Sequence, residues 1–447
     1  MTTMHEEVAK LEERMSTECY LSPPEHGLLA GISAEAFTRM HLEATRSKIA
    51  RLEKLDAVRL SDEGPRSMTR IFTHLAQLAN NPGGSIGVAN IAMAMLVVAY
   101  MTLDSSVARD ELQAFVLGHG PLDVIANTLL SSCRSVMLMT FDPDADDPNP
   151  PCNGCTTAPA TAIKEHIANV LDGQVLVTNR LCPDANAVAE VNAFCNAKTK
   201  GKIPTIATEF DPTTKAIILA AEYIEVSWAT VMDEDESGDF HGVDGTIHHQ
   251  DFACYHDQCL PVWVDSETNC TAVKVETKPV PGEWNRSMIF VLPPQGDNGK
   301  YFECAKNLHA DKFKMVDIGY FSLPVVNVAT NKLDGKELLQ TAGVNEIFFS
   351  LSALAPFFHD PSGMGGVVVS KITHMSCIKW NRFGAKAAAA TLVECVYRSI
   401  AVKPSFKFDR PFLAILGFDM EDGTFVPEFF TEVTGKGVTT TLGSHYD

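Results

Sequence analysis

Histidine and cysteine are the residue types whose spacing first suggests metal or redox chemistry in this chain. Cys152 and Cys155 have the two-residue separation of zinc knuckles and dithiol redox sites. A structural zinc needs four ligands, and this pair stands alone in the proline-rich loop 142–159, where a loop disulfide is the alternative. The window His241–Cys259 holds four histidines and two cysteines but fits no common zinc template. We therefore expect no metal ion and no cofactor.

Motifs of the common enzyme classes are absent from the sequence. It contains no Gly-x-Ser-x-Gly elbow, no Walker loop, no His-Glu-x-x-His pair and no dinucleotide fingerprint. This argues against a hydrolase, an NTPase and a dehydrogenase, and we expect that the protein is not an enzyme.

The segment Gly384–Ser399 has a pattern of a different kind. Its four successive alanines favour a surface helix when considered alone. However, every charged residue occupies an even position (Lys386, Glu394 and Arg398), and the odd positions hold small or apolar residues. Such alternation is what a strand with one buried face requires. One sequence is therefore suited to an exposed loop in one state and a strand in another.

Composition and charge limit the possible partners. The chain has 447 residues, 45% of them apolar and 21% charged, which excludes disorder for its bulk. Its 36 basic and 56 acidic residues give a formal charge of −20. A chain of this charge repels phosphate, and no local basic stripe offsets it, so we expect no nucleic-acid partner.

The elements that position these residues mix helices with strands. Apolar runs predict helices over Ile91–Thr102 and Ala185–Ala197, and strands over Gly366–Ser370 and Phe412–Gly417. Strands dominate the second half, so the sequence predicts an α+β domain over 67–447. A helical extension over 1–66 is expected to precede it.

The compartment is predicted from the first residues and the cysteines. The N-terminus lacks the basic and apolar regions of a secretory leader. We therefore expect mostly reduced thiols and a cytoplasmic location, with an extracellular location by an unrecognised route as the alternative. The longest apolar run, Ile91–Leu103, is too short to span a bilayer, so no membrane partner is expected.

Three segments resemble the serpin family. Phe406–Phe412 resembles the family signature downstream of the reactive loop, Ser370–His374 a strand with a buried histidine, and Ala220–Trp228 a strand of the main sheet. The resemblance covers roughly residues 68–434. It implies a serpin-like fold with a large mixed β-sheet, surrounding helices, smaller sheets and a mobile reactive-centre loop, here 382–404.

The resemblance also implies a function. Counting along the family's loop pattern from Gly384 gives Arg398 as the bait residue and Arg398–Ser399 as the bond that is cut. An arginine there implies a trypsin-like serine protease, which is trapped in a covalent complex when the cut loop enters the sheet. The inhibitor acts without catalytic residues, and we expect a monomer. The sheet-opening region implied by the resemblance contains Trp228 and His374. The implied hinge consists of Gly384, Ala385, Ala387, Ala388, Ala389, Ala390 and Thr391.

Three positions depart from the inhibitory pattern of the family. Arg382 stands where glutamate is usual, Ala385 where threonine or serine is usual, and Ala220 where an asparagine bonds the buried histidine. Ala385 is still small and does not block insertion, but the departures at Arg382 and Ala220 favour the alternative, a non-inhibitory serpin-fold binding or carrier protein whose loop is cleaved only as a substrate.

Overall fold

The computed structural model describes Phe72, Leu122 and most of residues 85–435. The residues outside the described part are 1–71, 73–84, 105, 118–121, 123–135, 142–157, 160, 171–174, 181–182, 226, 234–235, 280–284, 297–299, 329–332, 360–365, 371, 385–402, 421–422 and 436–447. The predicted helical extension over 1–66, the pair Cys152 and Cys155 and most of the reactive-centre loop therefore lie outside it.

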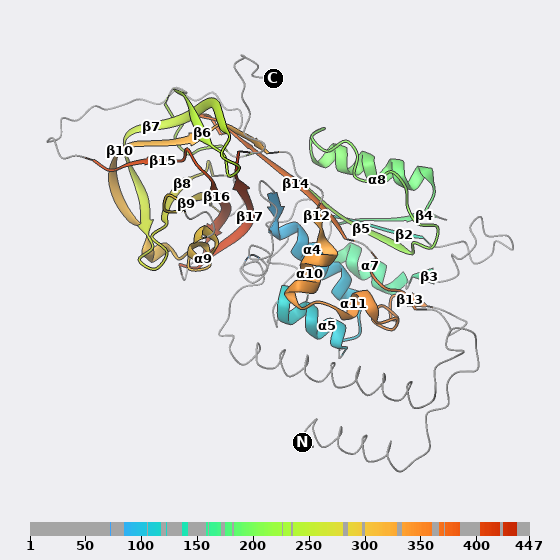
Figure 1. Ribbon diagram of the computed structural model, residues 1–447. Helices are drawn as coiled ribbons and strands as arrows, with labels where there is room; N and C mark the ends of the chain where they lie inside the picture. Colours follow the sequence, from blue (N-terminus) through green and yellow to red (C-terminus); the bar gives the residue numbers. More distant parts are fainter. Residues whose placement is uncertain are drawn as a thin grey trace, which may run out of the picture. The chain divides into compact units, whose positions relative to one another are not determined.

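The larger sheet has nine strands within the described part of the chain (Figure 1). All of its described strand pairs are antiparallel except β10 with β15, which is parallel. In spatial order its strands are β1 (Ser85–Gly87), β17 (Phe425–Val433), β16 (Phe412–Asp419), β9 (Arg286–Leu292), β8 (Thr271–Glu276), β7 (Ile247–Val264), β10 (Lys314–Pro324) and β15 (Ser405–Lys407), with β6 (Glu236–His241) paired to β7.

The second sheet is mixed and has six strands among the described residues. Its order is β11 (Val326–Val328), β14 (Thr373–Trp380), β5 (Ala216–Glu225), β2 (Val136–Phe141) and β4 (Val175–Arg180), with β12 (Leu333–Asp334) also on β14. The neighbours β14 and β5 run parallel, whereas β5 and β2 are antiparallel. A short pair, β3 (Ala158–Pro159) with β13 (Phe358–His359), stands apart.

One apolar helix fills the core, and the other described helices lie around it. Helix α4 (Val88–Tyr100) is apolar on all sides, and every residue from Val88 to Ala99 is buried. It contacts β2, β5 and β17 and so connects the two sheets. The other helices are α5 (Val107–Leu112), α7 (Thr161–Val170), α8 (Ala185–Lys198), α9 (Lys300–Ala305), α10 (Gly335–Ala342) and α11 (Glu346–Phe349), with a π-turn at Gln113–Leu117 and a 3₁₀ turn at Ala310–Lys312.

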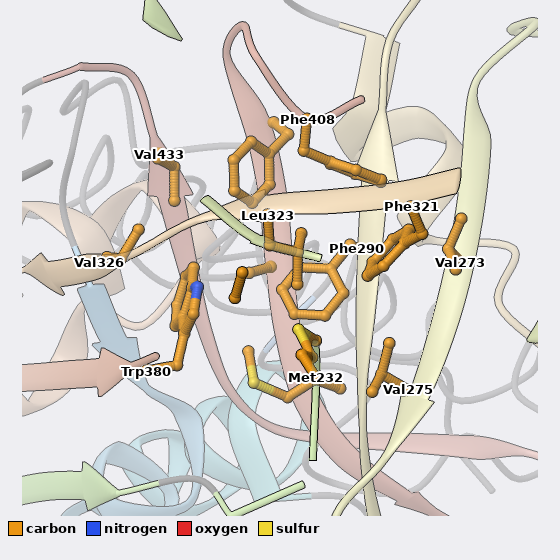
Figure 2. Packing of buried hydrophobic residues seen from close by; sticks show 14 of the residues in the cluster. Met232, Val273, Val275, Phe290, Phe321, Leu323, Val326, Trp380, Phe408 and Val433 are labelled. Carbon is orange, nitrogen blue, oxygen red and sulfur yellow. The ribbon is translucent and has the colours of Figure 1, made fainter. Parts of the chain in front are cut away.

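Aromatic rings dominate the core next to the larger sheet. Phe290 of β9 lies 5.9 Å from both Trp380 and Phe408, measured between ring centroids, and 6.3 Å from Phe321 (Figure 2). Trp380 is the last residue of β14, so one end of the second sheet is part of this aromatic cluster. Aromatic pairs at these separations prefer particular ring orientations, so they orient the side chains in addition to burying apolar surface.

Helix α8 covers the part of the second sheet that lies away from this cluster (Figure 1). Asp184 caps the helix by accepting a 2.9 Å hydrogen bond from the amide of Ala187. Val191 and Phe194 of the helix pack with Met139 of β2 and Leu219 of β5. Side chains alternate along a strand, so β5 uses its odd positions here and directs Ala220 to the other face.

The predicted helices agree with α4 and α8, and the predicted strand Phe412–Gly417 agrees with β16. The predicted strand Gly366–Ser370 is wrong. This segment is extended, but the amide of Val369 donates a hydrogen bond to the carbonyl of Ile347 in α11 instead of to a sheet neighbour. Of the helices described, none is long and apolar enough to cross a membrane.

Candidate functional site

The reactive-centre loop is described only at its two ends. Gly384 follows β14, and Lys403 precedes β15. Arg398 and Ser399 lie outside the described residues. So does the rest of the predicted hinge: Ala385, Ala387, Ala388, Ala389, Ala390 and Thr391. The geometry of the site is therefore that of its two anchors and of the strands between which the loop would enter.

A tight turn at Asn381–Gly384 forms the proximal anchor. The carbonyl oxygen of Asn381 accepts a 3.0 Å hydrogen bond from the amide of Gly384 and a 2.7 Å bond from the indole Nε1 of Trp228. Gly384 has a φ of +74°, a conformation that glycine adopts without strain, and it bridges to Ser227. The buried Trp228 thus ties the end of β14 to the segment that follows β5.

Arg382 sits within this turn and has no acidic partner in the described part of the chain. Its guanidinium lies 4.4 Å from the centre of the Phe383 ring, and its Nε has no hydrogen-bond partner among the described residues. Its carbonyl accepts a 2.9 Å bond from the amide of Met232. The turn is therefore held by backbone bonds and by Trp228, and no described ion pair contributes.

The distal anchor is an ion pair. Lys403 Nζ lies 2.7 Å from Asp257 Oδ1 and 3.2 Å from Asp317 Oδ1, on β7 and β10. The hydrogen bond to Asp257 raises the pKa of Lys403, and Lys403 in turn lowers the pKa of Asp257. The amide of Gly319 donates 2.9 Å to the carbonyl of Pro404, where β15 joins β10. This end of the loop is thus part of the larger sheet.

Strands β5 and β14 are direct neighbours between these anchors. Their residues pair in parallel from Ala220 beside His374 to Glu225 beside Lys379. No third strand lies between them. A strand that returned from the turn at Gly384 between β5 and β14 would be antiparallel to both.

His374 is the buried titratable group of this pair, with 1% of its surface exposed. Its Nε2 accepts a 3.0 Å hydrogen bond from the amide of Gly87, the last residue of β1 and the N-cap of α4, so the ring is neutral and carries its proton on Nδ1. Nδ1 has no partner among the described residues, and Ala220 opposite offers only a methyl group. Burial lowers the pKa of His374 to about 4.

Sequence reasoning missed the polar chain beside His374. Ser376 donates 2.9 Å to the carbonyl of Ser85, and Ser85 donates 3.0 Å to Thr431 of β17. All three hydroxyl residues are fully buried. The only sign of this chain in the sequence is Ser376, which lies two residues after His374 and therefore on the same face of β14.

The histidine-rich window proved to be a β-hairpin surface. His241 lies on β6, and His248, His249 and His256 lie on β7. His249 pairs with Asp239 at 3.0 Å, and His256 lies 3.5 Å from Glu236. Across the described part of the chain, no three His, Cys, Asp or Glu side chains gather as metal ligands would.

Comparison with a family model and with solved structures identifies proteins that are similar to this one. The model of the serpin (serine protease inhibitor) family matches residues 160–424, more than half of the chain. The chain belongs to the serpin family. Serpins are generally protease inhibitors rather than enzymes, and the match includes β5, β14 and both loop anchors.

Curated serpins share about a quarter of the matched residues with this serpin. Serpin-ZXA from rice is 25% identical over 247 residues, which cover 53% of this chain and 61% of the rice protein. Serpin A3-8 from cattle is 25% identical over 257 residues, covering 56% and 59%. The chain thus spans about 60% of the length of these two relatives.

Solved serpin structures share the fold over more of the chain. Tengpin, a thermophilic serpin in its native state, gives a TM-score of 0.65 at 17% identity and covers 83% of this chain and 93% of its own. AtSerpin1 from Arabidopsis in its native stressed conformation gives 0.63 at 18%, covering 83% and 99%. Human thyroxine-binding globulin complexed with thyroxine gives 0.61 at 16%, covering 83% and 97%.

Proposed function

We propose that this serpin is a suicide inhibitor of a trypsin-like serine protease, which it traps covalently after attack at Arg398–Ser399. The specificity pocket of such a protease carries a carboxylate, which pairs with a guanidinium. The protease would acylate at Arg398, and the freed hinge would enter the second sheet before the acyl bond is hydrolysed.

The observation that carries the proposal is the direct parallel pairing of β5 with β14, with the turn at Gly384 beside it. A strand inserted from this turn exchanges one parallel ladder for two antiparallel ladders. Antiparallel pairing is slightly more stable per residue, and the new strand adds a second set of hydrogen bonds. Insertion into this sheet is therefore favourable.

The two anchors explain why cleavage would trigger insertion. Before the cut, Lys403 and β15 hold the distal end of the loop on the larger sheet. The proximal part cannot travel far along β14 while the chain remains continuous through Arg398. Cutting at Arg398–Ser399 releases that part and leaves the distal anchor in place.

The hydrogen bonds of the turn also imply a register for the inserted strand. If pairing grows from the hydrogen-bonded residues Asn381 and Gly384, then Ala385 lies beside Trp380, Ala387 beside Ile378 and Thr391 beside His374. The even residues of β14 that are described are all buried: His374, Ser376, Ile378 and Trp380. Small odd residues of the loop would then share the buried face, and charged even residues would share the other.

A carrier protein is the second candidate, and two observations favour it. Among the residues that the structure describes, Arg382 has no acidic partner at the turn where insertion begins, and His374 has no partner for Nδ1. A relative of the same fold, thyroxine-binding globulin, was solved with thyroxine. In a carrier, the loop would be cut without trapping the protease.

Mixing the purified protein with trypsin separates the two candidates. An inhibitor gives a band on a denaturing gel at the summed mass of residues 1–398 and the protease, because the fragment 399–447 is released when Arg398 is acylated, and this band depends on Arg398. A carrier gives only the two cleavage fragments. Active-site-blocked trypsin is the control, because it cannot acylate and should give neither product.

A further inference from the structure

A half-exposed tyrosine lies flat on the larger sheet beside the distal loop anchor. Tyr320 of β10 stands opposite His256 of β7 and Ser405 of β15, and both of these neighbours are exposed. The hydroxyl of Tyr320 donates a 2.8 Å hydrogen bond to Glu236 on β6 and lies 3.2 Å from Cys254 Sγ. Cys254 is fully buried and precedes His256 by two residues. The tyrosine ring therefore lies along the sheet instead of standing away from it.

Neighbouring side chains hold this ring in place. The centroid of the His256 ring lies 5.2 Å from that of Tyr320, and Lys407 Nζ lies 5.4 Å from the Tyr320 centroid. His256 Nε2 is also 3.5 Å from Glu236 Oε1. We call Glu236, His256, Tyr320 and Lys407 the Tyr320 surface. An aromatic ring that is fixed before binding loses little conformational entropy on contact, and such rings supply much of the binding energy of protein interfaces.

Carboxylates form a rim around the Tyr320 surface. Asp233 accepts a 2.9 Å hydrogen bond from the amide of His256, and Asp257, whose side chain is 73% exposed, lies at the distal anchor beside Lys403. The rim consists of Asp233, Glu236, Asp257 and Asp317. These carboxylates outnumber the adjacent lysines, Lys403 and Lys407, so the rim is negative at neutral pH. An aromatic centre with a charged rim is the usual composition of a protein interface.

The length of the chain between the anchor and the reactive bond limits what can cover this surface. Four residue steps separate Ser399 from Lys403, and a fully extended chain spans at most about 14 Å over them. A domain of about 200 residues has a radius of gyration of about 16 Å. A protease that holds the bond Arg398–Ser399 in its cleft is therefore wide enough to cover the Tyr320 surface. The segment that leads to the rim also begins at the proximal anchor, where the amide of Met232 bonds the carbonyl of Arg382.

We propose that the Tyr320 surface is a second contact site for the attacking protease, and that it selects trypsin-like proteases with basic residues around the cleft. This proposal rests on the proposed function, because it takes cleavage at Arg398–Ser399 as given. The ring would pack against the protease beside its cleft, and the rim would attract its basic residues. Guanidinium groups suit both parts of the surface, since they pair with carboxylates and stack on aromatic rings. Attraction between complementary charges acts mainly on the rate of association.

Two trypsins that cut the same bond but differ in net charge test the surface. The protein is mixed with cationic trypsin or with anionic trypsin, and the second-order rate constant for loss of the intact loop is measured at low salt. This rate counts trapped and cleaved molecules alike, so it does not depend on trapping. The variant Asp233→Asn with Glu236→Gln removes two charges and keeps the oxygens that accept from the His256 amide and the Tyr320 hydroxyl. The control, Glu209→Gln with Asp211→Asn, removes two exposed charges before β5, at the end of that strand away from the loop anchors.

With cationic trypsin, the rim variant should react about 3- to 10-fold more slowly than the wild type, and about 0.5 M salt should remove the difference. With anionic trypsin it should react no more slowly than the wild type. Tyr320→Ala should slow both trypsins about 10-fold even at high salt, with its unfolding midpoint recorded to show that it folds. Equal rates for the rim variant and the wild type with cationic trypsin, or an equal loss in the control, would overturn the proposal. Failure of the proposed function gives a different result, because neither trypsin would then cut at Arg398, as the fragment masses would show.

Discussion

A matched pair of charge substitutions at neighbouring hinge positions tests loop insertion most sharply. In the proposed register Ala387 enters beside Ile378, which is fully buried in the cluster that contains Trp380 and Val326. These neighbours are apolar, so the guanidinium of Ala387→Arg finds no counter-charge among them. Burying an unpaired charge costs several kcal/mol.

That cost acts on a step that races against hydrolysis of the acyl bond. If about 3 to 4 kcal/mol of it appears in the barrier to insertion, insertion slows by about 100- to 1000-fold. We therefore expect Ala387→Arg to be cut at Arg398 and released, which converts an inhibitor into a substrate. The native fold should be unaffected, since the position is not inserted before cleavage.

The control is Ala388→Arg, one residue along. Its side chain would occupy the opposite face of the sheet, the face to which the half-exposed Lys379 already contributes a charge. We expect a stoichiometry of inhibition close to that of the wild type. Both variants are titrated against trypsin, and their unfolding midpoints are compared before cleavage.

Two results would refute this reasoning. If Ala388→Arg were the more harmful change, the register would be displaced by one residue, because such a slip exchanges the two faces. If both variants inhibited as well as the wild type, the hinge would not enter the sheet at all.

Three further predictions concern single side chains. Arg398→Ala should reduce the rate of association with trypsin at least about 100-fold, because a charge-assisted pair worth about 3 kcal/mol is lost, and an unchanged rate would remove Arg398 as the bait. The pKa of His374 is lowered to about 4 in the folded state from an ordinary 6.5, so the unfolded state binds the extra proton and stability should fall as pH drops from about 6.5 toward 4, by roughly 3 kcal/mol in all. His374→Gln keeps an acceptor for the amide of Gly87 and should remove this pH dependence in denaturant titrations. Ala220→Asn places an amide opposite Nδ1 and should raise the free energy of unfolding by about 1 kcal/mol, whereas Ala220→Leu, of the same shape without polar atoms, should not.

Local patterns in the sequence predicted those helices and strands whose residues are nearly all buried, or are buried at every second position. The apolar run of α4 and the strand Phe412–Gly417 belong to this class, because their surroundings are decided by their own residues. Gly366–Ser370 was misassigned because its extended backbone donates a hydrogen bond to a carbonyl of α11, and sequence does not reveal whether an extended segment finds a sheet neighbour. The family resemblance, and not spacing, pointed to Trp228 and His374.

Contacts between segments that are far apart in the sequence could not be predicted from local patterns. The amide of Gly87 meets His374, and Lys403 meets Asp257 and Asp317, only because strands far apart in the chain become neighbours. No local periodicity encodes which of several lysines will meet these carboxylates.

The central claim is that the cut loop becomes a strand between β5 and β14, and the heat stability of the cleaved protein tests it most directly. The loop is cut at Arg398–Ser399 with a catalytic amount of protease, and thermal unfolding is recorded before and after. Two antiparallel ladders in place of one parallel ladder should raise the midpoint by about 10 °C or more. An unchanged midpoint in the fully cut wild-type protein would contradict insertion and leave the carrier as the better account.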